Sequence, residues 1–234
     1  MAEPKIKTHI QQLGFFDHDL NSSSHDQTML WLQENINKVI NNLYYEPIEQ
    51  WEIDRLVNST KEKIQEHLPE LIRRNKHRQG FEKYIDLINT LQEWDGTEIL
   101  ERTWTRPEPK VHSVKWEVCV ERTGRTSSDK FTLGFIDMSV SYSTTHFLIK
   151  GIPYGQARQN QLSDYALPWM DFSELGYEVY FEVKSKIESV GALLRQINFY
   201  KSYKPGRYVV VSPDDRHKDL LASQGVGFVK AFAQ

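Results

Sequence analysis

Cysteine is almost absent from the chain, since Cys119 is the single example among 234 residues. One thiol cannot form a disulfide within the chain, and it cannot supply the four sulfur ligands of an all-cysteine zinc site. An iron–sulfur cluster held by cysteines is excluded for the same reason. Cys119 lies in a β-prone run, so we expect a small packed strand residue without a chemical role.

Long apolar runs are also missing, and the net charge is close to zero. No segment approaches the ~20 consecutive apolar residues that a membrane-spanning helix needs. Residues 1–12 (MAEPKIKTHIQQ) lack the apolar core of a secretory signal. We therefore expect a cytoplasmic protein with no membrane partner. The net charge of −3 provides no global basic field, so contact with nucleic acid would depend on local basic clusters.

The hydrophobic pattern changes near residue 96 and predicts two regions. Residues 1–95 are predicted to be helical and to serve recognition, dimerisation or partner binding, and the last of their helices is a candidate member of the following core. Ser24 and Ser59 each begin a capping-box pattern, and Pro47 suits the first turn of another helix. Pro69 is expected to kink or restart its helix. The first helix carries an apolar stripe at helical spacing, formed by Met29, Leu32, Ile36, Val39 and Leu43.

Residues 96–234 are predicted to form the second region, in which strands dominate. Alternating or strongly β-prone runs predict strands over 114–120, 131–142 and 177–183, with 146–149 pairing against the second. Residues 151–176 contain proline, glycine and amides, so we expect an inserted loop. The remaining pattern predicts helices and strands in alternation, which is typical of a sheet with parallel pairs: a helix at 187–203, a strand at 208–211, a helix at 215–223 and a strand at 227–229.

Three charged residues stand within the predicted strands. Asp137 belongs to the run GFIDM, and Glu182 and Lys184 belong to FEVK. Residues two apart in a strand face the same side, so Glu182 and Lys184 should point together. Carboxylates from adjacent strands can hold Mg²⁺, for which Mn²⁺ would substitute, with the backbone carbonyl of Val183 as a further ligand. A lysine beside a metal-bound water can orient that water and stabilise a phosphate.

This arrangement resembles the PD-(D/E)XK nuclease superfamily, with Asp137 as the aspartate and Glu182-Val183-Lys184 as E-x-K. The resemblance implies an α/β (α+β) fold, in which a restriction-endonuclease-like mixed central sheet is flanked by helices and preceded by the N-terminal helical region. It covers about the last 60% of the chain. The 45 residues that separate Asp137 from Glu182 exceed what a tight hairpin requires, so an excursion must lie between them.

Further matches point to the RecB-like branch of that superfamily. Gln196 and Tyr200 fit its Q-x-x-x-Y helix, and Gly134 with Asp137 fits its G-x-x-D. Residues four apart share one helical face, so Gln196 and Tyr200 can both face the metal site or a phosphate. Glu82 is the candidate for the glutamate that the family carries on its first helix. The iron–sulfur cysteines of some relatives are absent.

Two clusters of basic residues are candidates for phosphate contacts. Between Lys184 and Arg207 the chain has six basic residues and one acidic residue. Such contacts provide affinity without sequence information. A solvated helix face explains each residue equally well, and a basic helix end complementing the helix dipole is the other explanation for the second cluster. The candidates beyond Lys184 are Lys186, Arg195, Lys201, Lys204 and Arg207 in the first cluster, and Arg73, Arg74, Lys76 and Arg78 in the second.

The residues thus favour an enzyme, a Mg²⁺-dependent DNA endonuclease that hydrolyses phosphodiester bonds. Restriction or defence and transposon DNA cleavage are both open as its role. Because cutting two strands needs two sites, a homodimer is open, as is a partner protein bound through the helical region. The first alternative is a nuclease-like fold that binds DNA or protein without cutting. The second is an unrelated α/β interaction protein in which the motif is accidental.

Overall fold

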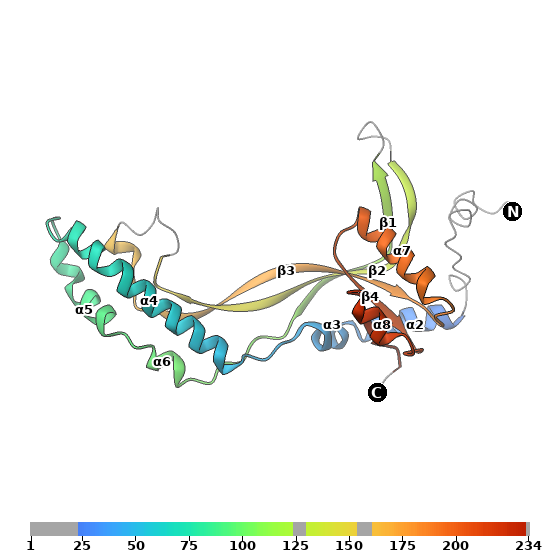
Figure 1. Cartoon of the computed structure of the whole chain (residues 1–234), viewed down its shortest axis with the longest axis horizontal. Helices are drawn as coiled ribbons and strands as arrows, with labels where there is room; N and C mark the ends of the chain where they lie inside the picture. Colours follow the sequence, from blue (N-terminus) through green and yellow to red (C-terminus); the bar gives the residue numbers. More distant parts are fainter. Residues whose placement is uncertain (1–22, 124–129, 154–160, 233–234) are drawn as a thin grey trace. The chain divides into compact units, whose positions relative to one another are not determined.

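A computed structural model describes residues 23–123, 130–153 and 161–232 (Figure 1). These residues form a mixed α+β fold that begins with helices, as the sequence predicts. The chain divides into two compact units. The first unit comprises the described residues of Met1–Tyr45, Pro109–Thr144 and Gly176–Gln234, and the second comprises those of Glu46–Glu108 and Thr145–Leu175. Neither unit has a boundary at residue 95, near which the hydrophobic pattern of the sequence changes.

The first unit contains most of a five-stranded sheet with strand order β1-β2-β3-β4-β5. β1 pairs with β2 antiparallel, whereas β3–β4 and β4–β5 are parallel pairs. Helices α7 (Val190–Tyr203) and α8 (Lys218–Ser223) supply the crossovers between the parallel strands, which confirms the predicted βαβ order. The strands are β1 (Lys110–Thr123), β2 (Lys130–Lys150), β3 (Trp169–Val183), β4 (Arg207–Ser212) and β5 (Gly227–Lys230).

Both faces of this sheet are covered, which explains the continuous apolar run in β4. Val209 and Val211 pack in one apolar cluster with the N-terminal helices, while Tyr208 and Val210 pack in another with α7. A strand buried on both faces has no need of the alternation that a half-exposed strand shows. Glu182 and its neighbours therefore lie in a sheet that is shielded from solvent on both sides.

The predicted stripe of the first helix is buried against the sheet, but on two helices rather than one. α2 (Ser23–Glu34) and α3 (Ile36–Tyr44) are separated at Asn35, which has a φ of −102° and donates its side-chain amide to the carbonyl of Trp31 over 2.8 Å. A side chain that bonds to the backbone in this way competes with regular helix geometry. The sequence pattern predicted the buried face and missed this break.

The second unit is built around a long helix, α4 (Gln50–Asn75). The sequence predicted two helices here, beginning near Pro47 and Ser59, and this prediction is wrong. The helix begins after a capping box formed by Glu49 and Glu52, and it continues through Pro69. One stripe of apolar side chains is buried along its length, so packing outweighs the hydrogen bond that the proline cannot make. The stripe comprises Ile53, Val57, Ile64, Leu68 and Leu71.

The described residues of Thr145–Leu175 also belong to the second unit, and a loop was expected over most of this stretch, at 151–176. Residues 154–160 of that expected loop lie outside the described residues. β2 continues to Lys150 and β3 begins at Trp169, so both strands contribute residues to both units. The predicted loop 151–176 is therefore wrong for its last eight residues, and the two predicted strands over 131–149 are a single strand. Phe147, Ile149 and Met170 pack in the apolar core of α4. The remaining helices of this unit are η1 (Phe81–Tyr84), α5 (Ile85–Glu93), α6 (Thr97–Leu100) and η2 (Leu162–Asp164).

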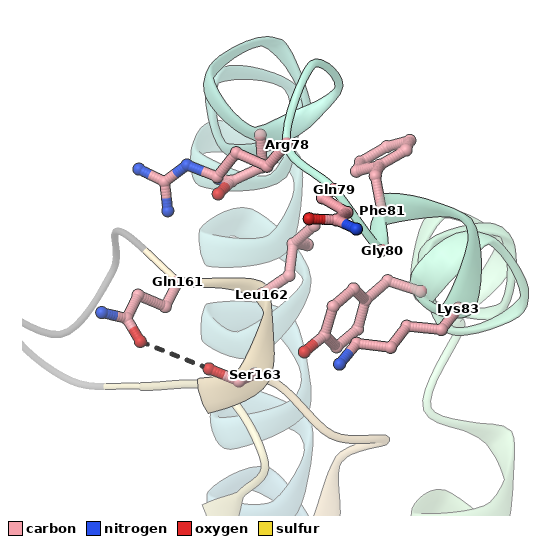
Figure 2. A pocket seen from close by; sticks show the side chains of 10 residues that line it. Arg78, Gln79, Gly80, Phe81, Lys83, Gln161, Leu162 and Ser163 are labelled. Atoms are coloured by element: carbon pink, nitrogen blue, oxygen red, sulfur yellow. Dashed lines mark hydrogen bonds between the residues drawn. The ribbon is translucent and has the colours of Figure 1, made fainter.

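A cavity of about 260 Å³ lies between the turn that follows α4 and the short helix η2 (Figure 2). The turn depends on Gly80, whose φ of 79° is in the left-handed region that side chains disfavour. Arg78 and Gln79 lie before this glycine, and Lys83 lies after it. Polar side chains on both sides of Gly80 therefore line one cavity.

Candidate functional site

Asp137 and the end of β3 are joined by a short hydrogen bond in the first unit. The backbone N–H of Val183 donates to Oδ2 of Asp137 over 2.6 Å. The carboxylate is 6% exposed, so its charge is held largely away from water. The N–H and C=O of one strand residue leave the strand on the same side. The carbonyl of Val183 is therefore directed toward the side on which Asp137 lies.

Glu182 and Lys184 interact directly, as their spacing in the strand predicts. Nζ of Lys184 lies 3.0 Å from Oε1 of Glu182. Phe181 and Val183 instead pack in the apolar cluster of α2 and α3. Glu182 is 1% exposed and Lys184 is 8% exposed. Burial of both ions is costly, and the pairing offsets part of this cost.

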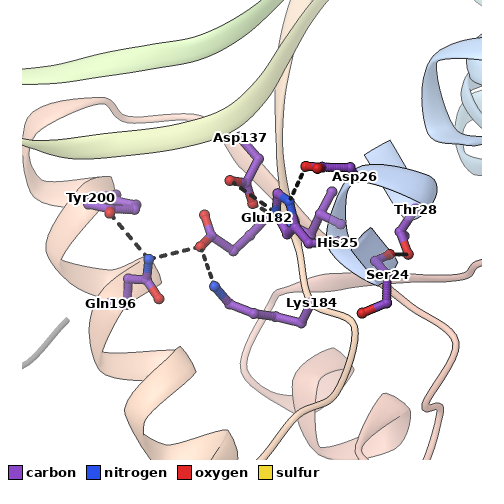
Figure 3. Close-up of polar contacts among 10 residues, drawn as sticks. Ser24, His25, Asp26, Thr28, Asp137, Glu182, Lys184, Gln196 and Tyr200 are labelled. Atoms are coloured by element: carbon purple, nitrogen blue, oxygen red, sulfur yellow. Dashed lines mark hydrogen bonds and ion pairs between the residues drawn. The ribbon is translucent and has the colours of Figure 1, made fainter. Parts of the chain in front are cut away.

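Helix α7 brings two more of the candidate residues to the same carboxylate (Figure 3). Nε2 of Gln196 donates to Oε1 of Glu182 over 2.8 Å and lies 3.2 Å from the hydroxyl oxygen of Tyr200. Burial raises the pKa of the Tyr200 phenol above its usual value of 10, and the negative charge of Glu182 raises it further. Tyr200 therefore stays protonated near this carboxylate. Four of the five residues predicted as catalytic are thus joined by side-chain contacts, and Asp137 binds the backbone N–H of Val183 beside them.

Gly134 has a steric reason for its place in the G-x-x-D pattern. A Cβ atom at this position would lie 2.8 Å from the hydroxyl oxygen of Tyr200 and 3.0 Å from its Cε1. Side chains do not approach so closely, so any larger residue would displace the ring or the strand. The absence of a side chain at Gly134 allows the ring of Tyr200 to lie directly against β2.

His25 is a member of the site that the sequence analysis missed. It lies near the start of α2, is 5% exposed, and its Nε2 is 3.7 Å from Oδ1 of Asp137. Its Nδ1 is 3.7 Å from the exposed carboxylate of Asp26. A single histidine beside a predicted helix start gives no signal of this role, because the sequence does not say which strand the helix will cover.

The donor atoms of the site suit a hard divalent cation. Carboxylate and carbonyl oxygens are the ligands that Mg²⁺ prefers, and Mg²⁺ keeps several waters of its own, so two carboxylates suffice. Among the residues that the structure describes, no group of three or more His, Cys, Asp or Glu side chains is spaced to hold a metal ion. Glu82, the predicted additional ligand, is exposed on η1 and belongs to the second unit. It is not part of the network around Asp137.

The basic residues after Lys184 differ in what they contact. Lys186 and Arg195 are exposed, and Lys204 is half-buried. Nζ of Lys201 donates to the carbonyl of Gly225 over 3.3 Å. The guanidinium of Arg207 lies over the rings of Tyr44 and Tyr177, 5.2 Å and 5.8 Å from their centres. Structural contacts thus account for the positions of Lys201 and Arg207, while Lys186 and Arg195 face solvent.

The second basic cluster is partly neutralised within its own helix. Arg73 and Arg74 both bind the carboxylate of Glu70, over 2.7 Å and 2.6 Å. These contacts lower the pKa of Glu70 to about 2, with the hydrogen bond from Arg73 as the largest cause. Lys76 and Arg78 follow at the end of α4 and are exposed. The two halves of this cluster are therefore not equivalent as candidates for a phosphate contact.

Comparison with known proteins adds no relative to this description. No family model matches the chain, and neither the curated proteins nor the solved structures include one that resembles it significantly. Within the described residues, no helix has the length and apolar character that crossing a membrane demands. The interpretation of the site therefore depends on its own geometry.

Proposed function

We propose that the chain is a Mg²⁺-dependent DNA endonuclease whose active site is formed by Asp137, Glu182 and Lys184. The observation that supports this most is the buried network itself. Asp137, Glu182 and Lys184 are residues no more than 8% exposed, and they gather around the end of β3. Proteins rarely bury such charges without a use for them.

Each residue has a role that follows from its position. Asp137 and Glu182 would hold the cation, with the Val183 carbonyl as a further oxygen ligand. The bound cation supplies Lewis acidity and lowers the pKa of a coordinated water. Lys184 carries a positive charge beside Glu182, where it would orient the attacking water and stabilise charge on the scissile phosphate. Gln196 fixes the rotation of the Glu182 carboxylate.

The experiment compares cleavage of supercoiled, linear and branched DNA by the parent chain and by three variants, with Mg²⁺, Mn²⁺ or EDTA. Asp137→Asn, Glu182→Gln and Lys184→Met remove one charge each while keeping the shape of the side chain. We expect each to lower the cleavage rate at least 10²-fold, and EDTA to abolish it. Mn²⁺ should substitute for Mg²⁺ in the parent.

Matched controls are available on exposed positions of the same unit. Asp219→Asn, Glu188→Gln and Lys218→Met make the same chemical changes away from the network. We expect these variants to cleave at the parental rate. Folding of every variant is checked by circular dichroism and thermal unfolding, because loss of one partner of a buried ion pair costs about 3–5 kcal/mol. Cleavage by folded Lys184→Met at the rate of Lys218→Met would refute the proposal.

A further inference from the structure

The charged side chains known to line the cavity in the second unit are all cationic. Its lining includes the cationic side chains of Arg78 and Lys83, and none of the ten described residues that line it is acidic. Figure 2 shows Arg78 and Gln79 on the turn after α4 and Lys83 on η1, with Ser163 on η2 and Gln161 just before it. The cavity volume of about 260 Å³ is large enough for a phosphate group with part of its sugar.

The two cationic groups are not committed to carboxylates. Within the described residues, neither Arg78 nor Lys83 forms an ion pair, in contrast to Arg73 and Arg74 with Glu70. Nζ of Lys83 lies over the ring of Tyr84, 4.9 Å from its centre. Such a contact leaves the charge of the ammonium intact. Both charges are therefore available to an anion.

Neutral donors complete the lining of the cavity. Oγ of Ser163 donates to Oε1 of Gln161 over 3.4 Å, which fixes the amide so that its N–H₂ group remains a donor. Gln79 contributes a second carboxamide from the opposite wall. Amide donors and an arginine fork around a polar cavity match the several acceptor oxygens of a phosphate better than they match an apolar ligand.

We propose that this cavity binds a backbone phosphate of a DNA strand, so that the second unit holds DNA independently of the metal site. The choice of DNA as the source of the phosphate rests on the function proposed above. The cavity also refines the role of the basic cluster at the end of α4. Arg78 contacts phosphate together with Lys83, whereas Arg73 and Arg74 neutralise Glu70.

The test measures DNA binding without cleavage, by fluorescence anisotropy of a labelled duplex in EDTA, on the full chain carrying Lys184→Met. Arg78→Gln/Lys83→Gln is compared with Arg55→Gln/Arg102→Gln, which removes two positive charges from exposed positions of the same unit outside this cavity. We expect the cavity variant to bind about tenfold more weakly at 0.1 M salt. The slope of log K against log salt should also become shallower by about 1, since one phosphate contact contributes about 0.9. Equal affinity and slope for the two double variants would overturn the proposal.

A charge-neutral variant tests the position of the ligand. Gln79→Ala/Ser163→Ala should weaken binding severalfold without changing the salt slope, because it removes hydrogen bonds and no charge. Unchanged affinity would place the phosphate outside the cavity and contradict the proposal. In a third arm, inorganic phosphate and a nucleoside monophosphate are titrated against the parent chain. Cavity-dependent binding of these small anions, together with cavity-independent binding of DNA, would assign the cavity to a free phosphate compound and overturn the DNA assignment.

The outcome is separable from that of the cleavage experiment. Binding is measured in a variant that lacks the amine of Lys184 and in the absence of divalent metal, so catalysis contributes nothing to the signal. If binding depends on the cavity but the parent chain, with Lys184 intact, cleaves none of the DNA substrates, the cavity proposal is supported and the nuclease proposal is refuted. If cleavage depends on Lys184 but DNA binding is unchanged in Arg78→Gln/Lys83→Gln, the nuclease proposal is supported and the cavity proposal is refuted.

Discussion

The side-chain amide of Gln196 on α7 donates to Glu182 on β3 over 2.8 Å, and this bond links the helix to the strand. It is made to Oε1, the oxygen that also lies 3.0 Å from Nζ of Lys184. Two donors on one oxygen fix the plane of the carboxylate. The packing of α7 on the sheet therefore determines how Glu182 is presented to a cation.

Loss of this amide should impair the site without unfolding the chain. In Gln196→Ala we expect Glu182 to rotate more freely, which lowers the cleavage rate or the affinity for Mg²⁺ about 10–100-fold. The measurement is the cleavage rate over a range of Mg²⁺ concentrations. Asn198→Ala, on an exposed position of the same helix, should leave both quantities at their parental values. Parental behaviour of folded Gln196→Ala would show that the hydrogen bond has no role in activity.

Gly134→Ala should act on the site through Tyr200. The added methyl group would lie 2.8 Å from the hydroxyl oxygen and 3.0 Å from Cε1, so we expect a loss of about 1–3 kcal/mol of stability together with reduced cleavage. Removal of the hydroxyl in Tyr200→Phe relieves the closer of these two contacts. The double variant should therefore be more stable than the sum of the two single changes predicts, which chemical denaturation of all four proteins would measure. Strict additivity would contradict a direct contact between these positions.

The order of elements was predictable from Tyr177 onward, because each strand there is a short β-prone run followed by a helix with its own signals. The N-terminal stripe also predicted a buried face correctly. The continuity of β2 and α4 was not predictable in the same way. A local signal such as the capping-box serine at 59 indicates a break, yet packing against a distant segment of the chain decides whether the element continues. Phe147, Ile149 and Met170 pack in the same apolar core as α4, from which they are separated by about 70 or more residues of sequence.

The candidate site was predictable where its spacing is local. The two-residue spacing of Glu182 and Lys184, and the four-residue spacing of Gln196 and Tyr200, place each pair on one face of a strand or helix. The contribution of His25 depends on the docking of α2 over β2, which is a tertiary event without a local pattern. By contrast, the ion pairs of Arg73 and Arg74 with Glu70 join residues three and four apart, so helical spacing could have predicted them. The sequence analysis grouped these arginines with Lys76 and Arg78 by charge alone.

Buried tyrosines of the first unit should make its stability sensitive to alkaline pH. Burial raises the pKa of the Tyr200 and Tyr208 phenols above 10 in the folded chain, and the charge of Glu182 adds to the effect at Tyr200. In the unfolded chain both phenols should titrate near 10. The folded state therefore binds these protons more tightly, so the stabilisation is complete below pH 10 and is lost as pH rises from 10 toward the folded pKa values.

We expect the free energy of unfolding, measured in urea, to be level between pH 8 and 9.5 and to fall above pH 10 by up to about 1.4 kcal/mol per pH unit for each phenol. Tyr208→Phe should weaken this decline, because one raised pKa is removed. It should also cost about 1 kcal/mol at pH 8, since the phenol donates to the carbonyl of Lys204 over 3.0 Å. Tyr203→Phe, at an exposed position of the same unit, should keep the parental decline. A parental decline in Tyr208→Phe would mean that other groups, and not this phenol, control the alkaline transition.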